Sequence, residues 1–202
     1  MRESLEQSSC HTVFARGYIE LSAVLTAAPT HHLAAYLRRF AGLHILALGT
    51  DRLEEERARC LSAGLAPTAI QHASRDIRYG RRHGVAQFRW FMLSPAVAPE
   101  GLVCFVDNRT PELVFQDEVQ SHPNGVLGLR GVIVLSDDAP GMAARYAQIL
   151  GLEPGRRGEG ARFALGASAR VLSPSSSAVA TLARCIRPPP PPRPAWRALS
   201  CR

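Results

Sequence analysis

The sequence predicts an α+β fold built from a repeated β-α-β-β-β unit, and three observations support this prediction. Residues 43–67 (LHILALGTDRLEEERARCLSAGLAP) recur without a gap as residues 130–154 (RGVIVLSDDAPGMAARYAQILGLEP). Each copy reads as an apolar strand, a polar helix start, a helix and a Gly-Leu-x-Pro exit. Strand-like segments follow the first copy, and residues 85–93 (VAQFRWFML) alternate most clearly. A long internal repeat of this kind indicates a duplicated supersecondary unit.

The segment before the first copy is predicted to hold strands and a short connecting helix. The β-rich composition of residues 11–24 (HTVFARGYIELSAV) predicts two short strands, or one strand with a kink at Gly17. Alternation places Tyr18 and Glu20 on one face, so Glu20 is either an outward-facing carboxylate or an inward functional acid. Without further context we favour the outward orientation. Apolar positions at helical spacing in residues 33–40 then predict the short helix.

Residues 42–115 are predicted to form a complete β-α-β-β-β module. The apolar strand at residues 45–48 is followed by Asp51, which can cap a helix, while Gly64 and Pro67 are typical of a helix end. The three remaining strands are expected at residues 70–75, 85–93 and 102–106. In the second of these, alternation predicts one face made of Ala86, Phe88, Trp90 and Met92.

Residues 116–175 are predicted to be a connector followed by a partial second copy, β-α-β-β. A strand is expected at residues 132–135, and Asp138 can open the following helix. Short strands are expected at residues 161–165 and 169–172. The second copy therefore stops one strand earlier than the first.

The composition changes again in residues 176–202, which are predicted to be a Pro-rich disordered tail. Residues 178–184 are expected to add at most a helical turn or two, and residues 188–192 are an uninterrupted proline run. Such a run has no backbone donors and favours an extended conformation.

The charge and the cysteine content indicate which partners and which cellular compartment to expect. The chain has 202 residues and a formal net charge of +7, and its basic residues are all arginine, but no nucleic-acid-binding motif accompanies them. The five cysteines contain no CxxC pair, which favours free thiols in a reducing compartment. There is no apolar signal core and no apolar run of membrane-spanning length. We therefore expect a cytoplasmic protein that binds neither nucleic acid nor membrane.

Several segments together resemble the vicinal oxygen chelate superfamily, which includes glyoxalase I, extradiol dioxygenases and bleomycin-resistance proteins. The segments are YIELSAV (18–24), LHILALGTD (43–51), FVDNRTPELVF (105–115), HPNG (122–125) and LRGVIVLSDD (129–138). The last three are similar to a glyoxalase-like branch of the superfamily. The resemblance covers roughly residues 11–173 and makes residues 1–41 the remnant of a first module that is truncated at its front.

The resemblance implies a curved mixed sheet with helices outside and a ligand cup within. In this superfamily, His and Glu side chains from the edges of each module hold one divalent metal, such as zinc, iron, manganese or nickel. Carried over to this sequence, the metal ligands would be Glu20, also the candidate catalytic residue, with His44 and Asp107. Trp90 and Asn108 are the candidate substrate-binding residues. The matching position in the second copy is a glycine, Gly131, so the ligand set is incomplete.

Three functions remain open at this point. The chain could bind a small oxygen-containing molecule over a metal and act as a lyase, isomerase or dioxygenase. It could instead bind or sequester a small molecule without metal, as bleomycin-resistance proteins do. It could also be an inactive fragment that needs a second copy to complete its sheet, because exposed strand edges favour a homodimer. Each candidate site residue also has a structural explanation, as a paired strand carboxylate, a hydrogen-bonded histidine or a turn aspartate.

Overall fold

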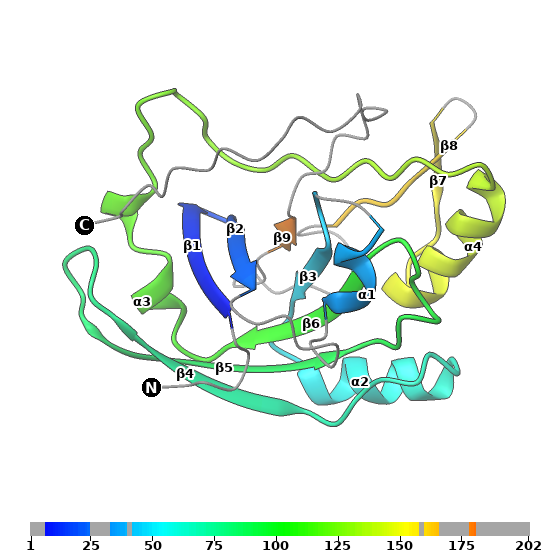
Figure 1. Cartoon of the computed structure of the whole chain (residues 1–202), viewed down its shortest axis with the longest axis horizontal. Coiled ribbons are helices and arrows are strands. Elements are labelled where there is room, and N and C mark those ends of the chain that lie inside the picture. Colours follow the sequence, from blue (N-terminus) through cyan, green and yellow to red (C-terminus); the bar gives the residue numbers. More distant parts are fainter. Residues whose placement is uncertain (1–6, 25–32, 40–41, 158–159, 166–177, 181–202) are drawn as a thin grey trace.

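The computed structural model describes residues 7–24, 33–39, 42–157, 160–165 and 178–180 (Figure 1). Its central element is a five-stranded mixed sheet in the order β4-β5-β6-β3-β9, in which β3 and β6 are parallel and the other neighbours are antiparallel. The strands are β3 (Ile45–Gly49), β4 (Gln71–Ile77), β5 (Gly84–Met92), β6 (Leu102–Asn108) and β9 (Ala178–Ala180). With helix α2 (Leu53–Ser62) between β3 and β4, residues 42–115 follow the expected β-α-β-β-β order.

One face of this sheet, the helix face, is covered by α2 and by α4 (Ala139–Leu150). Figure 1 shows both helices outside the curve of the sheet. The main core cluster joins strand residues to residues of both helices: Leu48, Phe91, Val103, Phe105, Leu53, Cys60, Tyr146, Ile149 and Leu150. The helices of the two sequence copies therefore pack on one sheet and share one core.

Arg59 of α2 ties these two helices together. Its Nη1 and Nη2 donate hydrogen bonds to the backbone oxygens of Gln148 (2.8 Å) and Ile149 (2.7 Å), in the last turn of α4. These carbonyls have no donor within their own helix, so the guanidinium serves as a C-terminal cap. Its Nε also pairs with Glu56 at 2.8 Å, a carboxylate that is 4% exposed. The contact joins a buried charge on α2 to the end of α4.

The opposite face, the hairpin face, carries the β-hairpin of β1 (Gln7–Phe14) and β2 (Gly17–Val24). Tyr18 packs against Ala47 and Cys104 of the central strands. In Figure 1 the hairpin lies inside the curve formed by β4, β5 and β6. Two short helices also pack on this face, α1 (Ala34–Leu37) next to Leu102 and α3 (Pro111–Val114) next to Ile77 and Ala86.

His122 of the connector also contacts the hairpin. Its Nε2 donates a hydrogen bond to the backbone oxygen of Val13 at 2.8 Å, and its ring meets Phe14 edge-on at 5.0 Å. The 3-10 turn η1 (Asp117–Val119) leads into this segment. His122 is therefore a structural anchor of the turn of the hairpin.

The strand expected at residues 132–135 does not form. The segment has no regular secondary structure and no ladder partner in the described part of the chain, and Ile133 and Leu135 are 77% and 72% exposed. A strand is stabilised by a neighbouring strand and by burial of one face, and this segment has neither. The strand predicted from the apolar sequence at residues 132–135 was therefore wrong.

The C-terminal part follows the prediction only in part. After α4, a small hairpin pairs β7 (Gly155–Arg157) with β8 (Gly160–Arg162), and β8 overlaps the strand expected at residues 161–165. Ala178–Ala180 forms strand β9 next to β3 instead of a helical turn or a disordered segment. The strand expected at residues 169–172 and the rest of the Pro-rich tail lie outside the described residues.

Candidate functional site

The candidate site lies between the hairpin and the hairpin face of the sheet, and Glu20 is its first component. Tyr18 packs on the sheet, and strand alternation places Glu20 on the same side of β2, as the sequence predicted. The carboxylate therefore faces the sheet and not solvent. Across the hairpin ladder its direct partner is His11, whose Nε2 lies 3.2 Å from Glu20 Oε2.

Hydrogen bonds hold the Glu20 carboxylate in its ionised form. The hydroxyl of Ser22 donates to Oε1 at 2.9 Å, and the hydroxyls of Ser22 and Ser9 lie 3.0 Å apart. Burial raises the pKa of the Glu20 carboxyl, but hydrogen bonds from His11, Ser9 and Ser22 outweigh burial and lower the pKa to about 2. The side chains of His11 and Glu20 are 14% and 27% exposed, so the pair is shielded but reachable.

Neutral side chains form the floor under this pair. Burial raises the pKa of the Tyr18 hydroxyl, and the nearby charge of Glu20 raises it further. Burial likewise raises the pKa of the Cys104 thiol to about 12, again with a contribution from Glu20. A thiol held protonated is a weak nucleophile, so Cys104 serves as a small apolar wall residue.

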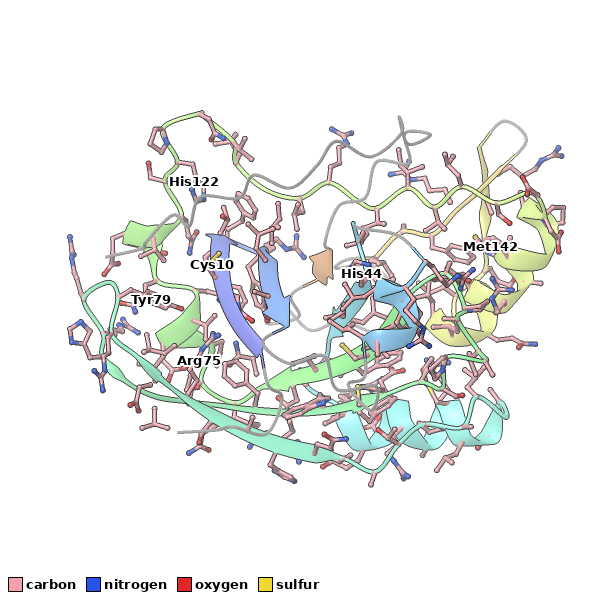
Figure 2. The ribbon with its side chains drawn as sticks, in the orientation of Figure 1. Cys10, His44, Arg75, Tyr79, His122 and Met142 are labelled. Atoms are coloured by element: carbon pink, nitrogen blue, oxygen red, sulfur yellow. The ribbon has the colours of Figure 1, made fainter. Side chains whose placement is uncertain are left out.

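Arg75 of β4 forms the positively charged side of the site. Its Nη1 lies 3.3 Å from His11 Nε2, and its guanidinium lies over the ring of Phe88 at 5.6 Å from the centroid. Figure 2 shows Arg75 near the strand β1 that carries His11. A hairpin residue and an edge-strand residue far apart in the sequence therefore meet at one place.

Trp90 and Asn108, the candidate substrate-binding residues, both belong to the hairpin face. Phe88 and Trp90 alternate with Phe91, which lies in the core of the helix face. Phe88 pairs with Asn108 across the β5–β6 ladder, so Asn108 shares this face. Trp90 and Asn108 are half-buried, and Asn108 Oδ1 accepts a hydrogen bond from the backbone of Thr110 at 3.3 Å. Both therefore lie on the face of the sheet towards which Glu20 points.

Asp107 lies on the other side of the sheet. It is 3% exposed and faces α2, where Arg89 contacts its Oδ2 through Nη2 at 2.5 Å and through Nε at 3.0 Å. Arg109 approaches the same oxygen at 3.3 Å, and Arg89 also bonds Glu54 of α2. The carboxylate is thus neutralised within an ion-pair network on the helix face, separated from Glu20 by the sheet.

His44 immediately precedes β3. Strand alternation groups it with Leu46 and Leu48, which pack in the helix-face cluster, while Ile45 and Ala47 face the hairpin. The backbone oxygen of His44 accepts from the amide of Leu102 at 2.7 Å, and its position is marked in Figure 2.

The structure therefore does not bring the three expected metal ligands together. Glu20 lies on the hairpin side of the sheet and Asp107 on the helix side. Strand alternation assigns His44 to the helix side as well. Within the described residues, no group of three His, Cys, Asp or Glu side chains is arranged to hold a metal ion. The donor set carried over from the resemblance does not fit a metal centre.

Sequence reasoning missed two residues of this site, His11 and Arg75. His11 could have been found, because a tight turn between Phe14 and Gly17 fixes the pairing of His11 with Glu20. Nothing local in the sequence distinguishes Arg75 from the other arginines. It joins the site only because the hairpin packs on the sheet.

A curved mixed sheet with α2 and α4 on one face, and with the hairpin and a polar cluster on the other, defines an α+β domain. The chain belongs to the glyoxalase-like domain family, whose model matches residues 6–150. This match confirms the resemblance to the vicinal oxygen chelate superfamily. Neither the curated proteins nor the solved structures contain a significant match to the chain. None of the helices in the described part is long and apolar enough to cross a bilayer.

Proposed function

We propose that this glyoxalase-like protein binds a small oxygen-containing molecule without a metal, between the hairpin and the sheet. One observation carries the proposal: Glu20 pairs with His11 at 3.2 Å on the hairpin side, while Asp107 is neutralised on the helix side. The carboxylate expected to complete a metal centre is therefore engaged elsewhere. What remains on the hairpin side is a set of hydrogen-bonding groups above aromatic residues.

The charges in the site also disfavour a divalent cation. His11 and Glu20 are two donors of types that metals accept, but the Arg75 guanidinium lies 3.3 Å from the same ring nitrogen of His11. A fixed positive charge at this distance repels a metal ion, and two protein ligands are fewer than structural or catalytic sites use. We therefore favour the metal-free function over the lyase, isomerase or dioxygenase function.

The side chains suit recognition of a small polar molecule. Small-molecule sites combine mostly apolar and aromatic walls with a few polar groups that fix orientation. Here Phe88 and Trp90 supply aromatic surface, Glu20 can accept a hydrogen bond from a hydroxyl, and the Asn108 amide can donate one. In this proposal the ligand lies along the hairpin face of β5 and β6.

Ligand titration of the isotope-labelled full chain tests the proposal. Small oxygen-containing fragments are expected to shift the amide resonances of His11, Glu20 and Trp90, and Glu20→Gln is expected to weaken binding about tenfold, a typical loss for a charge-assisted hydrogen bond. Glu55→Gln, an exposed change on α2, should leave the affinity unchanged. Fragment shifts confined to the helix face, or an unchanged affinity of Glu20→Gln, would refute the site.

A metal-loading measurement is the second test of the proposed function. The protein is dialysed against zinc, iron, manganese or nickel and then against buffer, and its metal content is measured. We expect less than one metal per chain, with no difference between wild type and Glu20→Gln. Retention of one metal per chain that disappears in Glu20→Gln would contradict the metal-free proposal.

A further inference from the structure

Arg75 is a charged component of the candidate site that forms no direct ion pair among the described residues. The ion pairs of those residues include Arg59 with Glu56, Arg89 with Asp107 and Arg145 with Glu100, but none contains Arg75. The neighbouring carboxylate on β4, Asp76, alternates to the other side of the strand and pairs with Arg78.

The guanidinium is nevertheless held in place. It lies over the Phe88 ring at 5.6 Å and has Nη1 next to His11 Nε2 at 3.3 Å. Its direct partner on β5 is Ala86, a small residue, and the adjacent position on its own strand face is Ala73. Stacking on an aromatic ring orients a guanidinium while leaving its edge available for further hydrogen bonds.

No carboxylate of the described residues lies within ion-pair distance of the Arg75 guanidinium. The Glu20 carboxylate, which contacts the same His11 nitrogen, bonds His11 and Ser22 instead and keeps its negative charge. Tyr18 and Tyr79, the other titratable groups near Arg75, are kept neutral because burial raises the pKa of both hydroxyls. An anionic group would complete the arrangement.

We propose that the ligand of this site carries a carboxylate that binds Arg75 in the bidentate manner. The inference rests on the proposed function and names its ligand class: a small organic acid with an aromatic or apolar body. The planar fork of a guanidinium matches the two oxygens of a carboxylate, and the bonds are charge-assisted. Phe88 and Trp90 then contact the body of the ligand, while Glu20 accepts a hydrogen bond from a hydroxyl group of the ligand.

The position of Glu20 decides between a carboxylate and a phosphate. Both groups suit a guanidinium, but Glu20 is ionised and its Oε2 contacts the same His11 Nε2 that Arg75 Nη1 approaches. Its repulsion of a bound anion increases with the charge of that anion, so a phosphate dianion is penalised more than a carboxylate monoanion. The aromatic surface of Phe88 and Trp90 also favours an organic acid over an inorganic ion.

Paired ligands that differ only in charge test the inference. The probes are acetate, benzoate and salicylate, each compared with its primary amide, and inorganic phosphate, all titrated by nuclear magnetic resonance into the full chain. We expect at least one acid to bind about tenfold more tightly than its amide. Arg75→Gln should remove this difference, and Arg75→Lys, which keeps the charge but not the fork, should retain part of it. Arg78→Gln, three positions along and exposed, should leave the difference unchanged.

The outcomes separate this inference from the proposed function. If amides bind as well as acids, or if Arg75→Gln leaves the preference intact, while shifts still centre on Glu20 and Trp90, the carboxylate inference fails and the proposed function stands. If phosphate binds as tightly as the best acid in an Arg75-dependent manner, the assignment to organic acids is overturned. If no probe shifts residues of the hairpin face, and the wider set of neutral fragments shifts none either, both proposals fail.

Discussion

Glu20 Oε2 lies 3.2 Å from Nε2 of His11, its direct partner across the β1–β2 ladder, and Glu20 shares a side of β2 with Tyr18, which packs on the sheet. Interacting cross-strand pairs stabilise a hairpin, and this pair also has hydroxyl donors around it. The same contact therefore contributes to both the stability of the hairpin and the chemistry of the candidate site.

The stability of the protein is expected to depend on the ionisation of Glu20. Its folded-state pKa of about 2 lies below the ordinary value of 4.5, so its contribution is fully present above pH 4.5 and is lost as the pH falls towards 2. Allowing for screening at a partly exposed site, this contribution is about 2 kcal/mol. Urea unfolding of Glu20→Gln should show a lower free energy of unfolding at pH 7 and convergence with wild type near pH 2. Parallel curves across this range would contradict the assignment, and the exposed change Glu153→Gln is the control.

Asp107→Asn is expected to destabilise the fold without affecting the candidate site. The change removes a 3% exposed carboxylate from Arg89 and Arg109, leaving Arg89 with Glu54 alone. Breaking one partner of a buried ion pair costs about 3 kcal/mol. Denaturant unfolding measures the loss, and ligand titration below the transition should give the wild-type affinity. A loss of ligand affinity without a loss of stability would instead show that Asp107 belongs to the binding site.

Gly80→Ala is expected to destabilise the protein more than Gly64→Ala does. Both glycines have positive φ, +68° and +73°, so both substitutions carry backbone strain of about 1 kcal/mol. A Cβ at Gly64 meets nothing within 4 Å, whereas one at Gly80 lies 2.5 Å from Gln116 Oε1.

Gln116 is the reason for this difference. Its amide donates to the backbone oxygens of Tyr79 (3.0 Å), Arg82 (2.9 Å) and Leu113 (3.1 Å), which ties the β4–β5 turn to α3. Displacing it breaks buried hydrogen bonds, so we expect Gly80→Ala to cost about 3 kcal/mol against about 1 for Gly64→Ala. Thermal unfolding compares the two variants, and equal losses would show that Gln116 adapts without cost.

His122→Ala is expected to loosen the hairpin while leaving the main sheet intact. The change removes the hydrogen bond to the Val13 oxygen and the edge contact with Phe14, together about 1–2 kcal/mol of local stability. Amide hydrogen exchange should become faster in residues 7–24 and stay unchanged in β5 and β6. His83→Ala, an exposed change in the β4–β5 turn, should alter neither region.

The sequence was most informative where local patterns and burial agree. Alternation correctly grouped Ala86, Phe88, Trp90 and Met92 on one face of β5, because each face of that strand packs against a different layer. It also correctly placed Tyr18 and Glu20 on one face of β2. The outward orientation favoured for Glu20 was wrong, because a strand pattern cannot show which layer covers which face.

The site itself depended on information that the sequence does not hold locally. The resemblance aligned His44 with a ligand position, but the alternation of β3 gives it the opposite face, since a shift of one residue in a strand exchanges the two faces. The apolar run at residues 132–135 resembles β3, yet β3 lies between β6 and β9 while the second run has no neighbour in the described chain. Arg75 and His11 meet only through packing of the hairpin on the sheet.

Within the described chain, β1 and β2 share backbone ladders only with each other, so the hairpin is held against the main sheet by side chains such as Tyr18 and His122. Separation of the hairpin from the main sheet would therefore break side-chain contacts but no backbone ladder of the described strands. Because Arg75 Nη1 lies 3.3 Å from His11 Nε2, a ligand that binds the guanidinium, as proposed above, would also change the surroundings of the hairpin. In that proposal, ligand affinity and the packing of the hairpin depend on the same side chain.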